Sequence, residues 1–256
     1  MRNIIVRRSV VAASAFSLAL LATACGSDKS TDNKDEPKAG SSSAPAAPAV
    51  KGKTDAEVKA LLVTQADLPD QIVSSDEGAQ AVAEGAGATV DKAECKVLMQ
   101  AQFGQKVGAP SGVGLTVAKD KLKEPAADAS PEDKLKAGLE AIGSTQTLVN
   151  LGSYDGKGAE EAFAAVKTAA TACSGGYTVT NGAENTKFLD VKPGSAVTAG
   201  DEAAAYTLTM DLEDGDKTTV HFVVVRKGNT LSSFSALGVV AKQPKTVIDA
   251  QVKKLG

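Results

Sequence analysis

From about residue 54 onward, apolar residues recur along the chain with two different periodicities, one typical of helices and one of strands. Spacings of three and four residues predict helices over 54–68, 91–103, 130–143, 159–173 and 244–255. Alternating residues predict strands over 113–117 and 147–151. Further strands are predicted over 177–180, 187–191, 203–210, 218–227 and 231–237. Because helices come first and hairpin-linked strands dominate later, this order predicts an α+β domain with a mostly antiparallel sheet and helices packed on one face.

Local start and turn signals support these elements. Thr54-Asp55-Ala56-Glu57 has the spacing of a capping box, and Pro131 stands at the favoured first position of its helix. Gly228-Asn229 separates two alternating runs, as the turn of a β-hairpin does. Residues 54–256 contain no repeat and no break in composition, so they are predicted to form one domain.

The first 24 residues have the composition of a secretory signal peptide. Three arginines and no acid precede an uncharged apolar run over 9–24, which is slightly shorter than the roughly 20 residues of a membrane span. The Arg7-Arg8 pair is also similar to a twin-arginine export signal, so the export route stays open. An uncleaved anchor helix is the alternative.

The end of the apolar run, Leu21-Ala22-Thr23-Ala24-Cys25, resembles the lipobox of bacterial lipoproteins, with Ala22 where leucine is commonest. The resemblance implies cleavage before Cys25, a diacylglycerol thioether on its sulfur, and further acylation such as palmitate. Two or more acyl chains hold a protein on a membrane far better than one. We therefore expect a lipoprotein anchored to the cell membrane on its extracytoplasmic face.

Residues 25–53 form the lipidated N-terminus and a predicted disordered linker. They are rich in Ser, Ala, Pro, Lys and Asp, and Val50 is their only large aliphatic residue. Such a segment buries too little apolar surface to offset the entropy of ordering it. The linker is expected to hold the domain away from the bilayer.

Overall composition excludes several classes of function. The 256 residues carry a net charge of −3, and aromatic residues make up 4% with no tryptophan. The chain therefore lacks the basic surface and stacking platforms of nucleic-acid binders. His221 is the only histidine, which excludes multi-histidine metal sites. No metal or cofactor is predicted.

With Cys25 assigned to lipid, Cys95 and Cys173 remain, and both fall on apolar faces of predicted helices. An oxidising compartment permits a disulfide between them, which would stabilise the domain by roughly 4–5 kcal/mol. Two buried free thiols are the alternative. A catalytic cysteine is less favoured, because a single histidine is available to activate it.

Several motifs resemble the PknH-like extracellular sensor domain family. They are residues 61–69 (LLVTQADLP), 172–175 (ACSG), 200–202 (GDE) and 221–229 (HFVVVRKGN). The resemblance implies an α+β domain with a cleft suggested to bind a ligand, found outside kinases and on lipoproteins. The kinase-linked prototype has two disulfides, whereas this chain can form one.

Three features could carry chemistry. His221 lies in a strand that is apolar on both faces, which favours a hydrogen-bonded core histidine over a catalytic one. Arg226 is a weak candidate for ligand binding, since one guanidinium can clamp a carboxylate or phosphate, and the alternative is a solvated charge covering an edge strand. Acids at 211, 213, 214 and 216 surround a turn, but their order does not match a calcium loop.

No nucleophile, base and orienting group can be assembled around one histidine, so a catalytic role is not predicted. The sequence favours a non-catalytic, sensor-like binding domain for a small envelope ligand or an envelope protein partner. A carboxylate-dependent envelope hydrolase is one alternative, and it would need a close carboxylate pair inside a cleft. A lipid or glycolipid carrier is another, and it would need a large apolar cavity.

Overall fold

The computed structural model describes residues 50–75, 87–122, 125–126, 128–212, 215–239 and 241–256. All of them belong to one unit, Ala46–Gly256. The predicted signal peptide, Cys25 and most of the predicted linker lie outside the described residues. No helix in the described part of the chain is long and apolar enough to cross a membrane.

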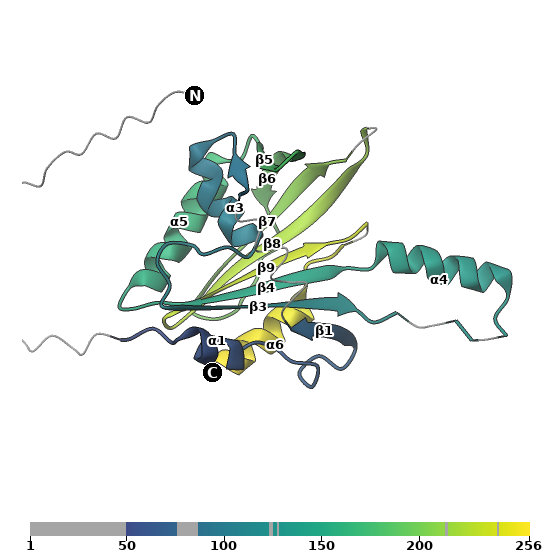
Figure 1. The fold of residues 1–256 in the computed structure, drawn as a ribbon, viewed down its shortest axis with the longest axis horizontal. Helices are drawn as coiled ribbons and strands as arrows, with labels where there is room; N and C mark the ends of the chain where they lie inside the picture. Colours follow the sequence, from purple (N-terminus) through teal and green to yellow (C-terminus); the bar gives the residue numbers. More distant parts are fainter. Residues whose placement is uncertain (1–49, 76–86, 123–124, 127, 213–214, 240) are drawn as a thin grey trace, which may run out of the picture. The chain divides into compact units, whose positions relative to one another are not determined.

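The described strands form one antiparallel sheet of nine strands (Figure 1). Their spatial order is β1-β3-β4-β9-β8-β7-β6-β5-β2, so β1 and β2 are the two edges. The bounds are β1 Gln71–Ser75, β2 Thr89–Val90, β3 Gly112–Asp120, β4 Gln146–Ser153, β5 Tyr177–Asn181, β6 Glu184–Pro193, β7 Glu202–Asp211, β8 Lys217–Lys227 and β9 Thr230–Leu237. This confirms the predicted α+β class with an antiparallel sheet.

Helices cover both faces of this sheet, not the single face predicted from the sequence (Figure 1). The helices are α1 Asp55–Ala60, the short 3₁₀ helix η1 Ala93–Cys95, α3 Lys96–Gln102, α4 Pro131–Gly143, α5 Gly158–Ala172 and α6 Lys245–Leu255. On one face, Val166 of α5 belongs to the same buried cluster as Phe222. On the other, Ile248 of α6 is buried with Val223.

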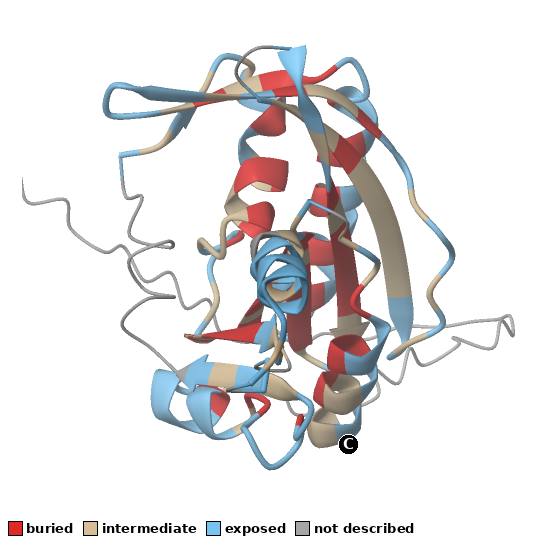
Figure 2. Ribbon diagram, turned by 90° about the vertical axis from the view of Figure 1, so that its right-hand side faces the viewer, coloured by how far each residue is buried: buried red, intermediate tan, exposed pale blue. Residues whose placement is uncertain are grey.

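The central strand β8 explains why two helical layers are needed. Phe222 and Val224 belong to the cluster under α3 and α5, whereas Val223 and Val225 belong to the cluster under α1 and α6. All four are completely buried. A strand that is apolar on both faces is stable only when both faces are covered. Buried residues accordingly lie along the central strands and on the helices packed against them (Figure 2).

The predicted capping box is present, but the helix that it starts is shorter than expected. The side chain of Thr54 accepts from the backbone N–H of Glu57, and Glu57 Oε2 accepts from the Thr54 N–H at 2.8 Å. The helix α1 ends at Ala60 instead of continuing to residue 68. Beyond it, Asp67 Oδ2 accepts from the backbone N–H of Thr64 at 2.8 Å, which stabilises a turn in place of helix.

The last residues of the predicted linker are hydrogen bonded to the domain. Gly52 N donates to Asp155 Oδ1 at 2.6 Å, and Asn229 Nδ2 donates to the carbonyl oxygen of Lys51 at 3.1 Å. These contacts are to residues about a hundred or more positions away along the chain. The ordered domain therefore includes residues 50–53, although nothing in their composition predicts it.

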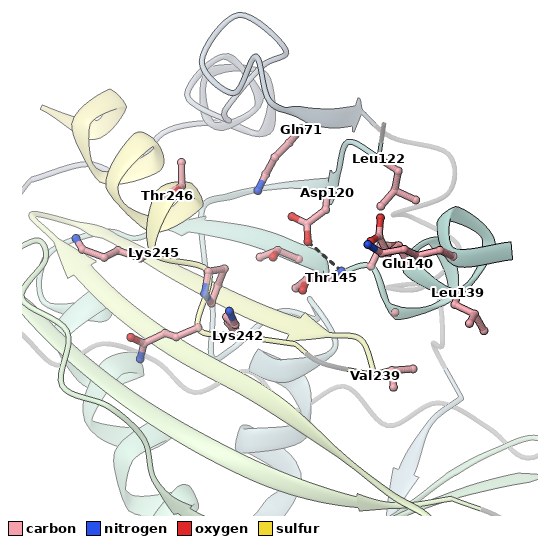
Figure 3. A pocket seen from close by; sticks show the side chains of 16 residues that line it. Gln71, Asp120, Leu122, Leu139, Glu140, Thr145, Val239, Lys242, Lys245 and Thr246 are labelled. Carbon is pink, nitrogen blue, oxygen red and sulfur yellow. Dashed lines mark hydrogen bonds between the residues drawn. The ribbon is translucent and has the colours of Figure 1, made fainter. Parts of the chain in front are cut away.

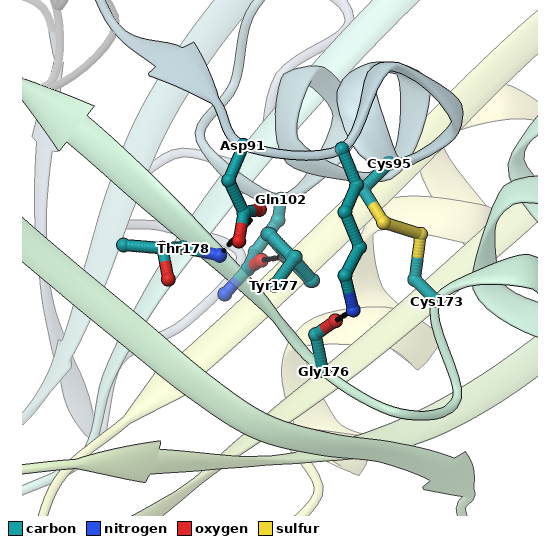
Figure 4. The surroundings of a disulfide bond; sticks show 8 residues. Asp91, Cys95, Gln102, Cys173, Gly176, Tyr177 and Thr178 are labelled. Atoms are coloured by element: carbon teal, nitrogen blue, oxygen red, sulfur yellow. Dashed lines mark hydrogen bonds between the residues drawn. A yellow bond between two sulfur atoms is a disulfide. The ribbon is translucent and has the colours of Figure 1, made fainter.

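Cys95 and Cys173 form a disulfide, the pair expected from the sequence (Figure 4). Both are completely buried, and the bond joins η1 to the residue that ends α5. Beside it, Asp91 Oδ1 accepts from the backbone N–H of Thr178 at 2.9 Å. The disulfide and this hydrogen bond together hold the segment preceding α3 against α5 and β5.

Candidate functional site

A cavity of about 570 Å³, here called the sheet trough, lies on the sheet face that carries α3. This volume falls in the range of roughly 300–1,000 Å³ that is usual for small-molecule sites. Six strands, β3, β4, β9, β8, β7 and β6, contribute to its lining, and the end of α3 forms a wall. The lining residues are Gln102, Phe103, Lys119, Ser144, Gln146, Leu148, Thr186, Phe188, Met210, Val220, Ser235 and Leu237.

The sheet trough is polar at one end and apolar at the other. Lys119 of β3 is the direct cross-strand partner of Gln146 of β4, and Ser144 lies just before that strand. Across the sheet, Phe188 of β6 is paired with Met210 of β7. Among the residues that the structure describes, no carboxylate lines the trough, and Lys119 is the only charged residue in its lining.

Two serines of β9 fix the α3 wall of the trough. Ser233 Oγ donates to the carbonyl oxygen of Ala101 at 2.9 Å, and Ser235 Oγ donates to that of Gln102 at 2.6 Å. The last carbonyl groups of a helix have no partner within the helix, so these side chains satisfy them. The wall is therefore held on the sheet by hydrogen bonds as well as by apolar contact.

Gln102 presents an amide group to the trough although its residue is only 5% exposed. Its Oε1 accepts a hydrogen bond from the Tyr177 hydroxyl (Figure 4). Burial raises the pKa of Tyr177 far above its usual range, so this hydroxyl stays protonated. No described residue accepts a hydrogen bond from the amide N–H groups of Gln102. They remain as donors at the wall of the trough.

A second cavity of about 780 Å³, here called the α6 cavity, lies near the start of α6 (Figure 3). Its lining includes Asp120 at the end of β3, Glu140 of α4 and three lysines, Lys136, Lys242 and Lys245. Asp120 Oδ2 accepts from the backbone N–H of Thr145 at 3.1 Å, which ties the end of β3 to the start of β4. Charges of both signs surround this cavity, in contrast to the sheet trough.

Arg226 lies outside the lining of both cavities. Its Nε is 2.6 Å from Glu202 Oε2, and its Nη1 is 3.2 Å from Asp201 Oδ2. The hydrogen bond that Arg226 donates to Glu202 raises the pKa of this guanidinium. The edge-strand alternative does not hold, because β8 lies between β7 and β9 in the sheet interior. The predicted role of Arg226 in ligand binding stays a prediction, with its guanidinium engaged by two carboxylates.

The single histidine is hydrogen bonded, as predicted, but it is half-buried instead of lying in the core. His221 Nε2 donates to the carbonyl oxygen of Ala241 at 3.0 Å, in the segment before α6. The possible calcium ligands at 213 and 214 lie outside the described residues. Elsewhere in the described part of the chain, no three His, Cys, Asp or Glu residues gather closely enough to hold a metal ion.

Comparisons with known proteins give a single kind of match. No family model matches the chain, and no curated protein matches it. Three chains of solved structures match, one of them the extracellular domain of PknH from Mycobacterium tuberculosis. That match has 14% sequence identity and a TM-score of 0.48, and covers 80% of this chain and 97% of the other. Membership of the PknH-like family stays a prediction from the sequence motifs.

Proposed function

We propose that this protein is a lipid-anchored extracytoplasmic lipoprotein whose domain binds a small, largely apolar ligand in the sheet trough without chemical turnover. The lipobox-like sequence ending at Cys25 supports the anchor and the compartment. The sheet trough supports the binding role, because it combines a ligand-sized volume with an apolar floor and a few polar groups.

The observation that carries this function is that the described lining residues of the trough include no carboxylate. Hydrolysis by paired carboxylates needs two such groups facing one substrate. Carboxylates do line other described cavities: Asp120 and Glu140 line the α6 cavity, and Asp249 lines a smaller one. Asp120 is hydrogen bonded to the backbone N–H of Thr145. The apolar lining of the trough therefore fits a binding site, or the site of a lipid carrier, better than it fits the active site of a hydrolase.

A blocking substitution at the mouth of the trough tests the function. Leu237 lines the trough and is 42% exposed, so Leu237→Trp fills the cavity without disturbing the core. Ile72→Trp is the matched control, because Ile72 is 52% exposed and lies outside the trough lining. We expect Leu237→Trp to weaken binding of the neutral apolar dye Nile red at least tenfold, with Ile72→Trp unchanged. Equal binding by Leu237→Trp and the wild type would refute the trough as the site.

The anchor is tested separately in cells. Cys25→Ala removes the sulfur that would carry the lipid, so we expect the protein to leave the membrane fraction. Replacement of both Cys95 and Cys173 by alanine is the control: it removes the other two cysteines of the chain and should leave fractionation unchanged. Detergent-dependent fractionation of Cys25→Ala would contradict the lipoprotein assignment.

A further inference from the structure

The geometry points to single-chain anionic amphiphiles as the ligands of the sheet trough. The acidic head lies at Lys119, and the apolar chain crosses the sheet toward Phe188. This inference rests on the proposed function and narrows it to a chemical class. It comes from the distribution of charge and polarity along the trough.

Lys119 gives the trough a positive charge that no carboxylate in the described part of the chain neutralises. Its side chain is exposed and forms no ion pair with any carboxylate in the described residues. The next residue, Asp120, faces the other way, because successive side chains of a strand point to opposite faces. Asp120 lines the α6 cavity and accepts from Thr145 there (Figure 3). An anionic group is therefore the natural partner for Lys119.

Apolar surface begins one strand away from this charge. Gln146 of β4 lies between Lys119 of β3 and Leu237 of β9 in the same cross-strand row. From there the lining continues over β8 and β7 to Phe188 of β6. Neighbouring strands are about 4.8 Å apart, so five such intervals make the trough roughly 24 Å long. An extended acyl chain with its head at Lys119 fits this length and polarity.

Gln102 also favours ligands that carry hydrogen-bond-accepting oxygen atoms. Its carbonyl oxygen is already occupied by the Tyr177 hydroxyl, so the group that it offers a ligand is the N–H donor. Lysine likewise has donors and no acceptor. The strongest polar contacts in the trough thus suit carboxylate, phosphate or ester oxygens, and neither suits an ammonium head group.

Ligands that share one tail and differ in head group test the inference. Dodecanoate, dodecanol and dodecyltrimethylammonium are compared by displacement of Nile red from the whole domain, with acetate as a head group that has no tail. We expect dodecanoate to bind about tenfold more tightly than dodecanol, the effect of one charge-assisted hydrogen bond. Acetate and dodecyltrimethylammonium should displace the dye least.

Substitution of the lysine separates charge from apolar contact. Lys119→Gln should abolish the preference for dodecanoate over dodecanol by weakening the binding of dodecanoate. Lys119→Glu should favour dodecyltrimethylammonium instead. Lys96→Gln is the control, because Lys96 is an exposed lysine of α3 outside the trough lining. All three substitutions are at exposed positions, so unfolding midpoints in urea should match that of the wild type.

The outcomes distinguish this inference from the proposed function. Equal affinity for dodecanol and dodecanoate in the wild type, or an unchanged preference in Lys119→Gln, would refute the anionic class and leave an apolar binding site. Failure of every tailed compound to displace Nile red, or failure of the dye itself to bind, would refute both. Binding of acetate as tight as that of dodecanoate would also refute the amphiphile, because the tail would contribute nothing.

Discussion

Replacement of both Cys95 and Cys173 by alanine removes the disulfide and leaves no free thiol in the domain. The two residues are 78 positions apart. In the chain-entropy model, a cross-link over that separation stabilises the folded state by about 4.5 kcal/mol at 25 °C. Domains have total stabilities of about 5–15 kcal/mol, so the loss is a large fraction of the whole. For a domain of this size it corresponds to a fall in Tm of about 9–18 °C.

The double variant should nevertheless fold, because other contacts hold the same segments together. Lys92 Nζ donates to the carbonyl oxygen of Gly176 at 2.5 Å. Asp91 also accepts from the backbone N–H of Thr178 (Figure 4). Binding of Nile red in the trough should therefore persist, since the serines of β9 still fix α3.

Urea unfolding followed by circular dichroism measures this loss. Wild-type protein in reductant should show the same reduced free energy of unfolding as the double variant, and reductant should not change the double variant further. A difference of less than about 1 kcal/mol between the double variant and oxidised wild type would show that the long loop supplies little of the stability.

Three other substitutions test single contacts by urea unfolding. Tyr177→Phe leaves Gln102 Oε1 buried without its donor and should lower the free energy of unfolding by about 1–3 kcal/mol, so an unchanged value would contradict that hydrogen bond. Gln251→Leu should cost about 3 kcal/mol, because the completely buried amide satisfies two backbone groups after α1, and a cost below 1 kcal/mol would argue against this role. The pKa of Asp67 falls from 3.8 to about 2, chiefly through the hydrogen bond from Lys254. Protonation therefore favours the unfolded chain, and stability from this carboxylate is lost as the pH falls from about 4 to 2. The Asp67→Asn variant should be less stable than the wild type at pH 7, and its free energy of unfolding should fall less between pH 4 and 2. Parallel pH profiles of stability for the variant and the wild type would contradict the contact between Asp67 and Lys254.

Regular patterns in the sequence predicted the long elements well. The strands from β3 to β9 alternate or run apolar for five residues or more, and α4, α5 and α6 keep helical spacing throughout. The edge strands were missed for a physical reason. Gln71–Ser75 is short with Ile72 exposed, and Thr89–Val90 has two residues, too few to show a period. Pairing with longer neighbours, not local preference, makes these segments strands.

The arrangement of helices around the sheet could have been predicted better. The run Val220–Val225 indicates a strand buried on both faces, which requires cover on both faces, whereas the element order alone suggested one. The trough could not be predicted, because its lining joins six strands and one helix that are distant in the sequence. Lys119 and Gln102 carry no local signal that separates them from other surface or helical residues. Their importance comes from the sheet register and from Tyr177, which only the folded chain brings together.

The interior strand β8 also determines how the unfolded chain behaves. Val220–Val225 is a six-residue segment of high β-propensity with no proline, and its sole polar member is a histidine. Such segments pair between molecules and aggregate when exposed. Lys217 precedes the segment, and Arg226 and Lys227 follow it directly, so cations flank it and oppose self-association. Closure of both helical layers over this strand during folding therefore protects the protein from aggregation.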